Sequence, residues 1–403
     1  MRGLGIIREW LPRLMQDRQL QRRIAGGLGL LGGVGVGLAG YALLHEPVAI
    51  ELERLTLRLP NARGRLPHNG LKILHLSDTH FQNLTRRERT KIERIRRLTA
   101  DLEYDLLVHT GDFWHNEAGI ENVATLLDLL PKPRLGAYGV LGNHDYVCYS
   151  HSDILTRNWQ RYQQVSANGH HKGTAAPVYQ NGAGAPVYQN GYAHGATSSA
   201  SPLPSPQNGV VAQNTMLPPL SWLEFVQDSI QFIRYFLNVP FDLERVSLNN
   251  VQMLVETLHE HGVEILHNRS VHLRHQPGEA DGVDLHLAGV DDVSEGAVDL
   301  AAAWAETPAD SLKILLSHNP DILEEPASRR ADLILAGHTH GGQVALPLLG
   351  AAHTQSIHLG RREAAGYMRR DNTHVYVTRG IGEGIPLRFG AKPQITLLTI
   401  MAE

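Results

Sequence analysis

The amino-acid sequence predicts an α/β fold in which helices cover a β-sheet, and three observations lead to this prediction. Between residues 71 and 141, short apolar segments alternate with longer segments of helical periodicity. The apolar segments end in aspartate, asparagine and histidine, which collect at the carboxyl ends of strands in α/β sheets. The chain of 403 residues is long enough for one large α/β domain with accessory segments.

The composition excludes several kinds of protein. A formal net charge of -4 argues against a broad nucleic-acid-binding surface, so no nucleic-acid polymer is expected as a partner. The single cysteine excludes an intramolecular disulfide framework and any thiolate-rich zinc or iron–sulfur site. The chain has 23 histidines, so a bound metal would be held by imidazole, carboxylate, amide and water.

The N-terminal sequence predicts a membrane anchor. Residues 1–23 contain six arginines and two acidic residues, and we expect this basic segment to stay in the cytoplasm. The uncharged run that follows, residues 24–44, would cross a hydrocarbon core of roughly 30 Å as a helix. We therefore predict a single-pass anchor over residues 24–45, with the domain that follows it outside the cytoplasm. The run holds eight glycines, so a glycine-rich helix buried in the domain is the alternative.

Two arginines, Arg22 and Arg23, stand directly before this run, as in a twin-arginine export signal. The residues after the pair match such a signal only in part, and no small-x-small cleavage site follows Leu44. We therefore expect an uncleaved anchor. Because a twin-arginine route moves folded proteins, any metal would be loaded in the cytoplasm before export.

The elements of the domain follow in order. Residues 46–70 are predicted to form a linker and an edge strand over residues 49–59. The first half of the domain, 71–149, is predicted to have strands at 71–76, 105–109 and 137–141 and helices at about 85–102 and 119–130. The second half, 220–403, is predicted to have strands at 262–267, 271–273, 285–290, 312–316, 333–336 and 375–378.

Residues 150–219, between the two halves, lack this pattern. Residues 173–219 have no charged side chain, and they contain the repeat A-P-V-Y-Q-N-G, which starts at Ala176 and again at Ala185. A segment of this composition cannot bury enough apolar area to offset the entropy lost on ordering. We therefore predict a disordered surface insertion, with a functional binding loop as the alternative.

Two further segments have both a structural and a membrane interpretation. The apolar stripe from Trp222 to Phe236 has helical spacing and predicts a helix packed on the core, with an interfacial membrane helix as the alternative. A basic run is predicted to be the solvated face of a helix: Arg86, Arg87, Arg89, Lys91, Arg94, Arg96 and Arg97. Contact of this run with anionic lipid headgroups, at about 1 kcal/mol for each cation, is its alternative.

Polar side chains of one chemical kind stand at five predicted strand ends. The motifs are Asp78-x-His80, Gly111-Asp112, Gly142-Asn143-His144-Asp145, Ser317-His318 and Gly337-His338-Thr339-His340. Because strand carboxyl ends converge in such sheets, we expect these side chains to share one cleft. They offer more donors than one ion can use, so two divalent metals about 3.5–4 Å apart fit the set.

In this order the motifs resemble those of the calcineurin-like metallophosphoesterase superfamily. Residues 74–80, 317–321, 335–343, 376–382 and 386–388 are similar to its branch of membrane-associated predicted phosphohydrolases. That branch includes twin-arginine-exported cell-wall enzymes and proteins described as UDP-2,3-diacylglucosamine hydrolases or phosphodiesterases. The resemblance implies a four-layer α/β/β/α sandwich of two mixed sheets flanked by helices, to which an N-terminal membrane helix is added. Residues 150–219 have no counterpart in the branch.

The resemblance also implies roles for individual residues. The first of two metal ions would be held by Asp78, His80, Asp112 and His340, and the second by Asn143, His318 and His338, with Asp112 as the bridge. A hydroxide between the metals would attack the phosphorus, His144 would protonate the leaving oxygen, and Asp145 would orient His144. The ions would be Mn, Fe or Zn, with Mn favoured.

Four other residues close to the motifs are given less specific roles. His75 and His109 are predicted to be buried, hydrogen-bonded histidines. Cys148 is predicted to be a small packed residue, because no base or helix start that would activate it is evident. For His115 a substrate contact and a plain surface role are both open.

Three functions follow from these expectations. The first is a membrane-anchored dinuclear phosphoesterase that hydrolyses a phosphodiester or phosphomonoester, lipid-linked or in the cell wall, at the envelope. The second is a UDP-2,3-diacylglucosamine-type lipid pyrophosphate hydrolase, against which the predicted topology argues, because nucleotide-activated lipids are usually made on the cytoplasmic leaflet. The third is a non-catalytic metal-stabilised scaffold, against which His144 and Asp145 argue, because a scaffold needs no general acid.

Overall fold

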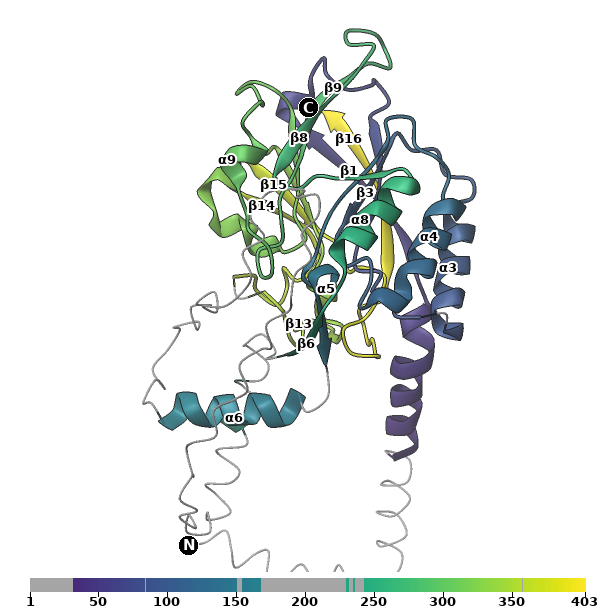
Figure 1. Ribbon diagram of the computed structural model, residues 1–403, viewed down its shortest axis with the longest axis vertical. Helices are drawn as coiled ribbons and strands as arrows, with labels where there is room; N and C mark the ends of the chain where they lie inside the picture. Colours follow the sequence, from purple (N-terminus) through teal and green to yellow (C-terminus); the bar gives the residue numbers. More distant parts are fainter. Residues whose placement is uncertain are drawn as a thin grey trace, which may run out of the picture.

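Two six-stranded sheets and the helices outside them form the folded part of the chain (Figure 1). The computed structural model describes residues 32–83, 85–150, 154–167, 230–231, 235, 243–356 and 358–403. All strands that the sequence predicts are present within these residues. The α/β prediction is therefore confirmed.

The first sheet has the strand order β1-β16-β2-β3-β4-β7. Its strands are β1 (Glu51–Leu59), β16 (Gln394–Ala402), β2 (Leu71–Leu76), β3 (Leu106–Thr110), β4 (Ala137–Val140) and β7 (Val263–Ile265). The sheet is mixed, because β16 runs antiparallel to β2 while the other neighbours are parallel. β1 lies at one edge, as predicted for residues 49–59, and β16 is a strand that the sequence analysis missed.

The second sheet has the order β14-β15-β11-β10-β9-β8. Its strands are β14 (Gly366–Arg370), β15 (Thr373–Val377), β11 (Leu333–Ala336), β10 (Lys313–Leu316), β9 (Val283–Gly289) and β8 (Arg269–His275). The inner four strands are parallel, and the outer strands β14 and β8 run antiparallel to their neighbours. This sheet is therefore mixed as well.

Alternate side chains of the strands fill the space between the two sheets. Ile73 of β2 and Val108 of β3 pack in one buried cluster with Leu287 of β9 and Leu316 of β10. Leu74, the neighbour of Ile73, belongs to a second cluster on the outer face of the first sheet. Strands buried on both faces read as continuous apolar runs, which is why they were recognisable in the sequence.

Helices cover the outer face of each sheet. α3 (Arg86–Thr99), α4 (Ile120–Leu129) and α8 (Val251–Glu260) contribute to the cluster outside the first sheet. α9 (Leu300–Ala303) and a short 3-10 helix, η5 (Pro320–Glu324), contribute to a third cluster outside the second sheet. The layers are therefore helices, sheet, sheet and helices, as the resemblance implies.

Helix α3 begins with a capping box and corrects one prediction. The Thr85 hydroxyl accepts from the backbone N–H of Glu88, and the Glu88 side chain accepts from that of Thr85. Lys91 was predicted to lie on a solvated basic face, but it is buried and its Nζ lies 2.8 Å from Oε1 of Glu383. The basic run is therefore divided between a solvated face and a buried ion pair.

The stretch predicted to be a disordered insertion contains a helix at its start. β5 (Val147–Ser150) pairs with β6 (Glu244–Leu248), and α6 (Ile154–Ala167) follows β5. The prediction of disorder from residue 150 is therefore wrong for α6, whose apolar residues recur at helical spacing. Residues 168–219 lie outside the described residues, as does the predicted helix at 222–236 apart from residues 230, 231 and 235.

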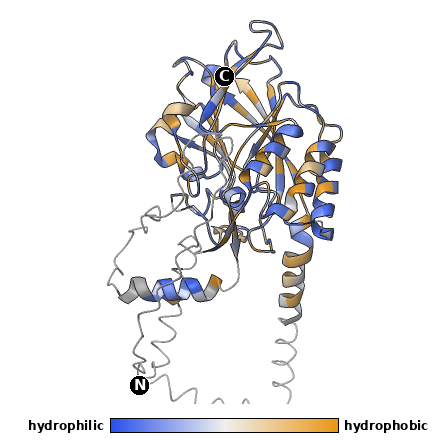
Figure 2. Cartoon of the chain, viewed as in Figure 1, coloured by the Kyte–Doolittle hydropathy of each residue, from blue (hydrophilic) through white to orange (hydrophobic). Residues whose placement is uncertain are grey.

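An apolar helix precedes the sheets and extends from one end of the folded part (Figures 1 and 2). Residues 32–40 are helical and continue into η1 (Tyr41–His45) and η2 (Glu46–Val48). Arg87 donates to the carbonyl oxygen of Leu43 at 2.6 Å, which ties this helix to α3. The predicted basic segment, residues 1–23, and residues 24–31 of the predicted anchor are not among the described residues. Within the part that is described, no helix combines the length and apolar character needed to cross a membrane.

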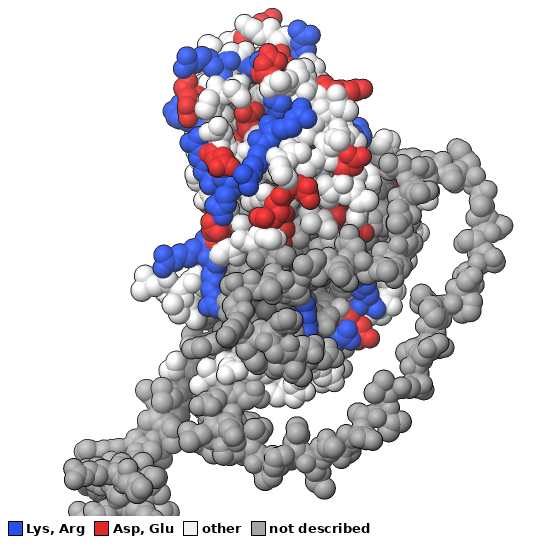
Figure 3. Space-filling model, turned by 90° about the vertical axis from the view of Figure 1, so that its left-hand side faces the viewer, with Lys and Arg blue, Asp and Glu red and all other residues white. Residues whose placement is uncertain are grey.

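Basic and acidic side chains are interspersed on the face shown in Figure 3. Ion pairs such as Arg329–Asp371 and Arg370–Glu363 join cations and anions at the surface of the second sheet. Pairs of this exposed kind contribute between about 0 and 1 kcal/mol each. The fold therefore depends on its apolar clusters more than on these charges.

Candidate metal centre

The predicted site residues all follow the carboxyl ends of strands, and the strands come from both sheets. In the first sheet, Asp78 and His80 follow β2, Asp112 follows β3, and Asn143 begins the short helix α5 (Asn143–Tyr146) after β4. In the second sheet, His318 follows β10, and His338 and His340 follow β11. The structure brings these seven side chains together where the ends of the two sheets meet.

One cluster consists of Asp78, His80 and His340. Nε2 of His80 and Nε2 of His340 lie 3.0 Å apart. Oδ1 of Asp78 lies 4.0 Å from Nε2 of His80 and 3.7 Å from Nε2 of His340. All three residues are buried, so their donor atoms face one another rather than bulk water.

The second cluster consists of Asp112, His318 and His338, with Asn143 beside it. Nε2 of His318 lies 3.1 Å from Nδ1 of His338 and 3.2 Å from Oδ1 of Asn143. The other ring nitrogen of His318 lies 2.7 Å from the carbonyl oxygen of Thr110, to which only an N–H can donate. Nε2 of His318 is therefore the nitrogen that faces the cluster.

Asp112 links the two clusters through a single oxygen atom. Its Oδ2 lies 3.2 Å from Nε2 of His80 and 3.2 Å from Nε2 of His318. Burial alone would raise the pKa of Asp112, but the nearby histidines, His318 foremost, hold that pKa well below its usual range. Asp112 is therefore a carboxylate placed between two groups of donors.

Several of these residues have an unusual backbone conformation. The φ angle is 52° at Asp78, 47° at His80, 55° at Asp112, 69° at His338 and 51° at His340. Non-glycine residues in this left-handed region cost of order 1–3 kcal/mol each and cluster at functional sites. The chain also passes close to Asp112 at Gly142, where a Cβ would lie 2.3 Å from Oδ1 of Asp112. Local strain is therefore concentrated where the donor atoms meet.

The donor atoms fit divalent metal ions. In the first cluster, neutral ring nitrogens and a carboxylate oxygen approach within about 3–4 Å, where their lone pairs repel unless a cation lies among them. In the second cluster, burial lowers the pKa of His318 but the charge of Asp112 outweighs it and raises that pKa to about 10, so positive charge is favoured among those donors too. Burial lowers the pKa of His338 to about 3 and lowers that of His340 well below its usual value, so both rings are neutral. Neutral imidazole, carboxylate and amide are ligands that Mn, Fe and Zn accept. The residues therefore suit two ions.

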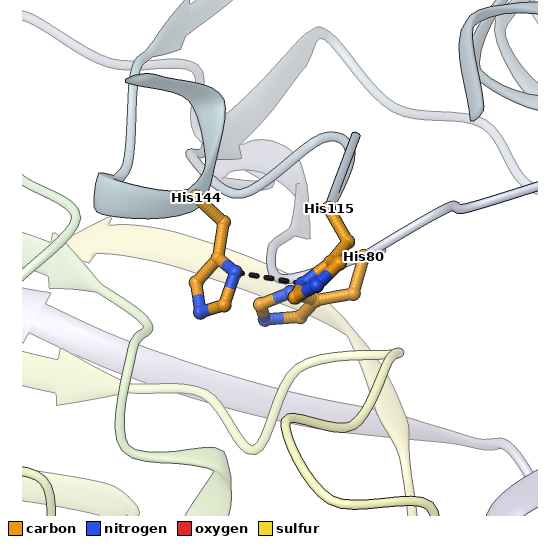
Figure 4. A group of neighbouring side chains, drawn as sticks. All are labelled: His80, His115 and His144. Carbon is orange, nitrogen blue, oxygen red and sulfur yellow. Dashed lines mark hydrogen bonds between the residues drawn. The ribbon is translucent and has the colours of Figure 1, made fainter. Parts of the chain in front are cut away.

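A third group of side chains, His80, His115 and His144, lies next to the clusters (Figure 4). Nδ1 of His144 lies 2.9 Å from Nδ1 of His115. Nε2 of His115 lies 3.0 Å from the carbonyl oxygen of Tyr149. His115 is buried, so the plain surface role that the sequence left open is wrong. Its position three residues after Asp112 is the signal that could have assigned it to the site.

Asp145 does not orient the ring of His144, which corrects the role expected for it. Its carboxylate is fully buried and accepts the backbone N–H groups of Asp112, Phe113, Trp114 and Gly142 at 2.8–3.3 Å. The backbone N–H of His144 donates instead to Oδ1 of Asp112 at 2.8 Å. Asp145 therefore holds together the two loops that carry Asp112 and His144.

Arg388 is a further residue of the site that the sequence analysis did not single out by itself. It is fully buried, and its guanidinium donates to the carbonyl oxygens of His340, Gly382 and Ala391. One guanidinium nitrogen also lies 3.3 Å from Nδ1 of His340. Arg388 therefore fixes the loop that carries this candidate ligand.

The three other residues near the motifs have mixed outcomes. His75 is buried, and its Nε2 lies 2.9 Å from the hydroxyl of Thr110, as predicted. His109 is buried and stacked on Phe113, but neither of its ring nitrogens has a hydrogen-bond partner among the described residues, so its predicted hydrogen bond is wrong. Cys148 is partly buried, and burial raises the pKa of its thiol, which agrees with a packing role.

Comparisons of the sequence with known proteins indicate a phosphoesterase. The family model described as calcineurin-like phosphoesterase matches residues 71–342. The UDP-2,3-diacylglucosamine pyrophosphatase LpxG of Chlamydia muridarum is 27% identical over 89% of this chain and 91% of the relative. The phosphodiesterase YaeI of Escherichia coli is 30% identical over 37% of this chain and 52% of the relative. The structure of the phosphopantetheinyl hydrolase PptH from Mycobacterium tuberculosis covers 80% of this chain, and 96% of that structure is matched, with 11% identity and a TM-score of 0.32.

Proposed function

The chain belongs to the calcineurin-like phosphoesterase family and is a hydrolase of phosphate esters, and from that premise we propose a membrane-anchored phosphoesterase with two divalent metal ions. One observation carries the proposal. Oδ2 of Asp112 lies 3.2 Å from Nε2 of His80 in one donor cluster and 3.2 Å from Nε2 of His318 in the other. A single buried structural ion would not need two such groups of donors.

In this proposal each cluster holds one ion. The ligands are Asp78, His80 and His340 for the first ion, Asn143, His318 and His338 for the second, and Asp112 for both. Two bound dications neutralise phosphate oxygens and lower the pKa of water at the site toward neutrality. The amide of Asn143 adds no negative charge, which keeps the site attractive to a phosphate ester. Manganese is the first ion that we would supply, ahead of iron and zinc.

His144 supplies the proton for the leaving oxygen in this proposal. Its Nδ1 faces His115, and its ring lies 4.6 Å from the ring of His80 between their centroids. The contact with His115 holds the ring of His144 beside the two clusters, from where it would give the proton to the leaving oxygen. Asp145 acts through the backbone, by holding the loops of Asp112 and His144 at a fixed separation.

The membrane part of the proposal rests on the sequence. Residues 1–23 are basic and residues 24–44 are uncharged, an arrangement that places the basic end in the cytoplasm. The catalytic domain then lies outside the cytoplasm, at the cell envelope. The apolar helix over residues 32–40 supports the proposal, because Val34, Val36 and Leu38 are exposed in it.

The substrate that we propose is a phosphodiester or phosphomonoester of the envelope, lipid-linked or in the cell wall. A nucleotide-linked lipid pyrophosphate is the second candidate. The observation that favours it is the similarity to the UDP-2,3-diacylglucosamine pyrophosphatase of Chlamydia muridarum over 91% of that relative. The same two clusters would serve for cleavage of a pyrophosphate, so substrate assays must separate the two candidates.

The experiment uses the purified full chain with manganese and three substrates. These are bis-p-nitrophenyl phosphate, p-nitrophenyl phosphate and UDP-2,3-diacylglucosamine. His144→Ala and Asp112→Ala are measured beside His272→Ala, which removes an exposed histidine of β8 and serves as the matched control. We expect turnover of the diester that both site variants lose and the control keeps.

Each other outcome has a defined meaning. Turnover of UDP-2,3-diacylglucosamine without turnover of either nitrophenyl ester would favour the second candidate. Metal binding without turnover of any of the three substrates would contradict the proposed enzyme and favour a metal-stabilised scaffold.

A further inference from the structure

A hairpin of two short strands follows directly after the candidate ligands. It consists of β12 (Ala345–Leu346) and β13 (Gly350–Ala351), and begins five residues after His340. The side chains near and at its tip are apolar and exposed. Leu346 is 41% exposed, Leu348 is 90% exposed and Leu349 is 63% exposed. Three leucines are thus turned away from the protein beside the catalytic site.

The backbone of Leu348 makes this exposure more unusual. Its φ angle is 67°, in the left-handed region that glycine adopts freely and leucine adopts only with strain. No packing within the described part of the chain offsets that strain, since nearly all of the side chain is exposed. We therefore expect the side chain of Leu348 to contact an apolar environment outside the chain.

The base of the hairpin is joined to the N-terminal helix through Phe389. The backbone N–H of Ala345 donates to the carbonyl oxygen of Phe389 at 2.7 Å. The ring of Phe389 packs edge-on against Tyr41, with ring centroids 6.4 Å apart. The next residue toward the N-terminus, Arg388, donates its backbone N–H to the carbonyl oxygen of Ala42 at 3.0 Å. The hairpin and the helix therefore belong to one end of the folded part, where Figure 1 also places β13 and the C-terminal end of the helix.

The helix at this end is as apolar and exposed as the hairpin. Val36 is 75% exposed and Leu44 is 74% exposed, and the segment from residue 32 to residue 44 has no charged side chain. Cations flank both apolar elements. Arg362 donates to the carbonyl oxygen of Leu348 at 3.0 Å, and Arg87 donates to that of Leu43 at 2.6 Å. Apolar side chains with arginines around them are typical of a surface that enters an anionic lipid bilayer.

We propose that the hairpin of β12 and β13 is a second membrane contact, which inserts Leu346, Leu348 and Leu349 into the bilayer from which the N-terminal helix emerges. The two contacts together fix the orientation of the domain, which a single helix does not. They also hold His340 and its neighbouring ligands close to the lipid surface. The preferred substrate is then an amphiphilic phosphate ester whose chains stay in the bilayer, and this last step rests on the proposed function.

The first test measures where the tip of the hairpin lies. The full chain is prepared with Cys148→Ser, labelled with NBD at Leu348→Cys, and placed in nanodiscs of phosphatidylcholine and phosphatidylglycerol. Glu279→Cys carries the same label in the exposed β8–β9 loop at the opposite end of the folded part, as the matched control. We expect blue-shifted emission and quenching by doxyl-labelled lipid at position 348, and water-like emission with iodide quenching at position 279.

Two results would overturn the membrane contact. Equal iodide quenching at both positions would place the hairpin in water. Blue-shifted emission at position 348 that lipid quenchers leave unchanged, and that persists in detergent, would mean that a protein surface covers the leucines instead.

The second test measures what the contact does for the reaction. The variant Leu346→Ser/Leu348→Ser/Leu349→Ser is compared with Leu129→Ser, which removes an exposed leucine of α4. Turnover of hexadecyl p-nitrophenyl phosphate in vesicles is expected to fall at least about tenfold in the triple variant only, while turnover of soluble bis-p-nitrophenyl phosphate stays unchanged. Equal loss on both substrates would overturn the proposal, because it indicates damage to the site. If the wild type hydrolyses neither ester, the first candidate substrate class is wrong, and the quenching result still decides whether the hairpin enters lipid.

Discussion

Nδ1 of His115 and Nδ1 of His144 lie 2.9 Å apart, and the other ring nitrogen of His115 lies 3.0 Å from the carbonyl oxygen of Tyr149. A carbonyl oxygen only accepts, so Nε2 of His115 carries the hydrogen and its Nδ1 is the acceptor. The hydrogen between the two rings therefore belongs to Nδ1 of His144. His115 thus fixes the position of the hydrogen on Nδ1 of His144 and the orientation of that ring.

Substitution of His115 tests this relationship. In His115→Ala the ring of His144 loses its acceptor, and we expect kcat to fall by roughly 10–100-fold with a smaller change in KM. His115→Asn keeps an acceptor oxygen near the same place and should recover part of the loss. The measurement is steady-state hydrolysis of bis-p-nitrophenyl phosphate, with His272→Ala as the control. Unchanged kcat in His115→Ala would show that His144 works without this partner.

Asp112→Asn tests the shared ligand. The amide keeps the size of the side chain but loses the negative charge that faces both clusters, so we expect metal content to drop from two ions per chain. Removal of a residue that only hydrogen-bonds to a metal ligand lowers activity by roughly 10–100-fold. Because Asp112 is itself a proposed ligand, we expect turnover to fall by more than that. Metal content is measured by elemental analysis after gel filtration, with Asp281→Asn in the exposed β8–β9 loop as the control. Two retained ions in Asp112→Asn would contradict the bridge.

The carboxylate of Asp145 has a structural role that can be measured apart from catalysis. Asp145→Ala leaves four buried backbone N–H groups without their acceptor, and each unsatisfied donor costs about 1–3 kcal/mol. We expect the free energy of unfolding to decrease by at least about 3 kcal/mol in urea titrations. Asp281→Ala, in the exposed β8–β9 loop, should change it by less than about 0.5 kcal/mol. A loss below about 1 kcal/mol in Asp145→Ala would mean that water replaces the carboxylate.

The buried pair Lys91–Glu383 fastens α3 to the loop that leads to Arg388. Nζ of Lys91 lies 2.8 Å from both carboxylate oxygens of Glu383 and donates to the carbonyl oxygen of Ile381 at 3.0 Å. Lys91→Met leaves the buried carboxylate unpaired, and we expect a loss of about 3–5 kcal/mol in stability. The double variant Lys91→Met/Glu383→Leu should recover most of that loss in a double-mutant cycle. Additive losses would show that the two side chains act independently.

Much of the fold was predictable because its strands are local patterns. Residues 71–76 of β2 form a short apolar run that ends at polar residues, and the observed strand has the same bounds. β16 was missed because nothing around it marks its partner β1, which lies more than 300 residues away. β14 was missed because it is a partly exposed edge strand without an apolar run. The helix α6 was missed because the uncharged repeat that follows it dominates the composition of residues 150–219.

The candidate site was predictable in membership but not in all its contacts. The resemblance of the motifs to the calcineurin-like family implied seven ligands, and the structure brings those seven residues together. The contact of His115 with His144 joins loops after different strands, and only the folded backbone sets their separation. The same reason explains the error over Asp145. Its distance in sequence from His144 is one residue, yet its carboxylate points to the backbone of residues 112–114.

The left-handed backbone at Asp78, His80, Asp112, His338 and His340 makes this protein a case of trade-off between stability and activity. Glycine adopts such a conformation without strain, so replacing any of these five by glycine relieves the backbone while it removes a donor atom. A selection of random variants for higher melting temperature would therefore enrich inactive chains. Engineering a more thermostable enzyme from this sequence requires a library in which those five codons are not varied. The screen must measure turnover as well as melting temperature.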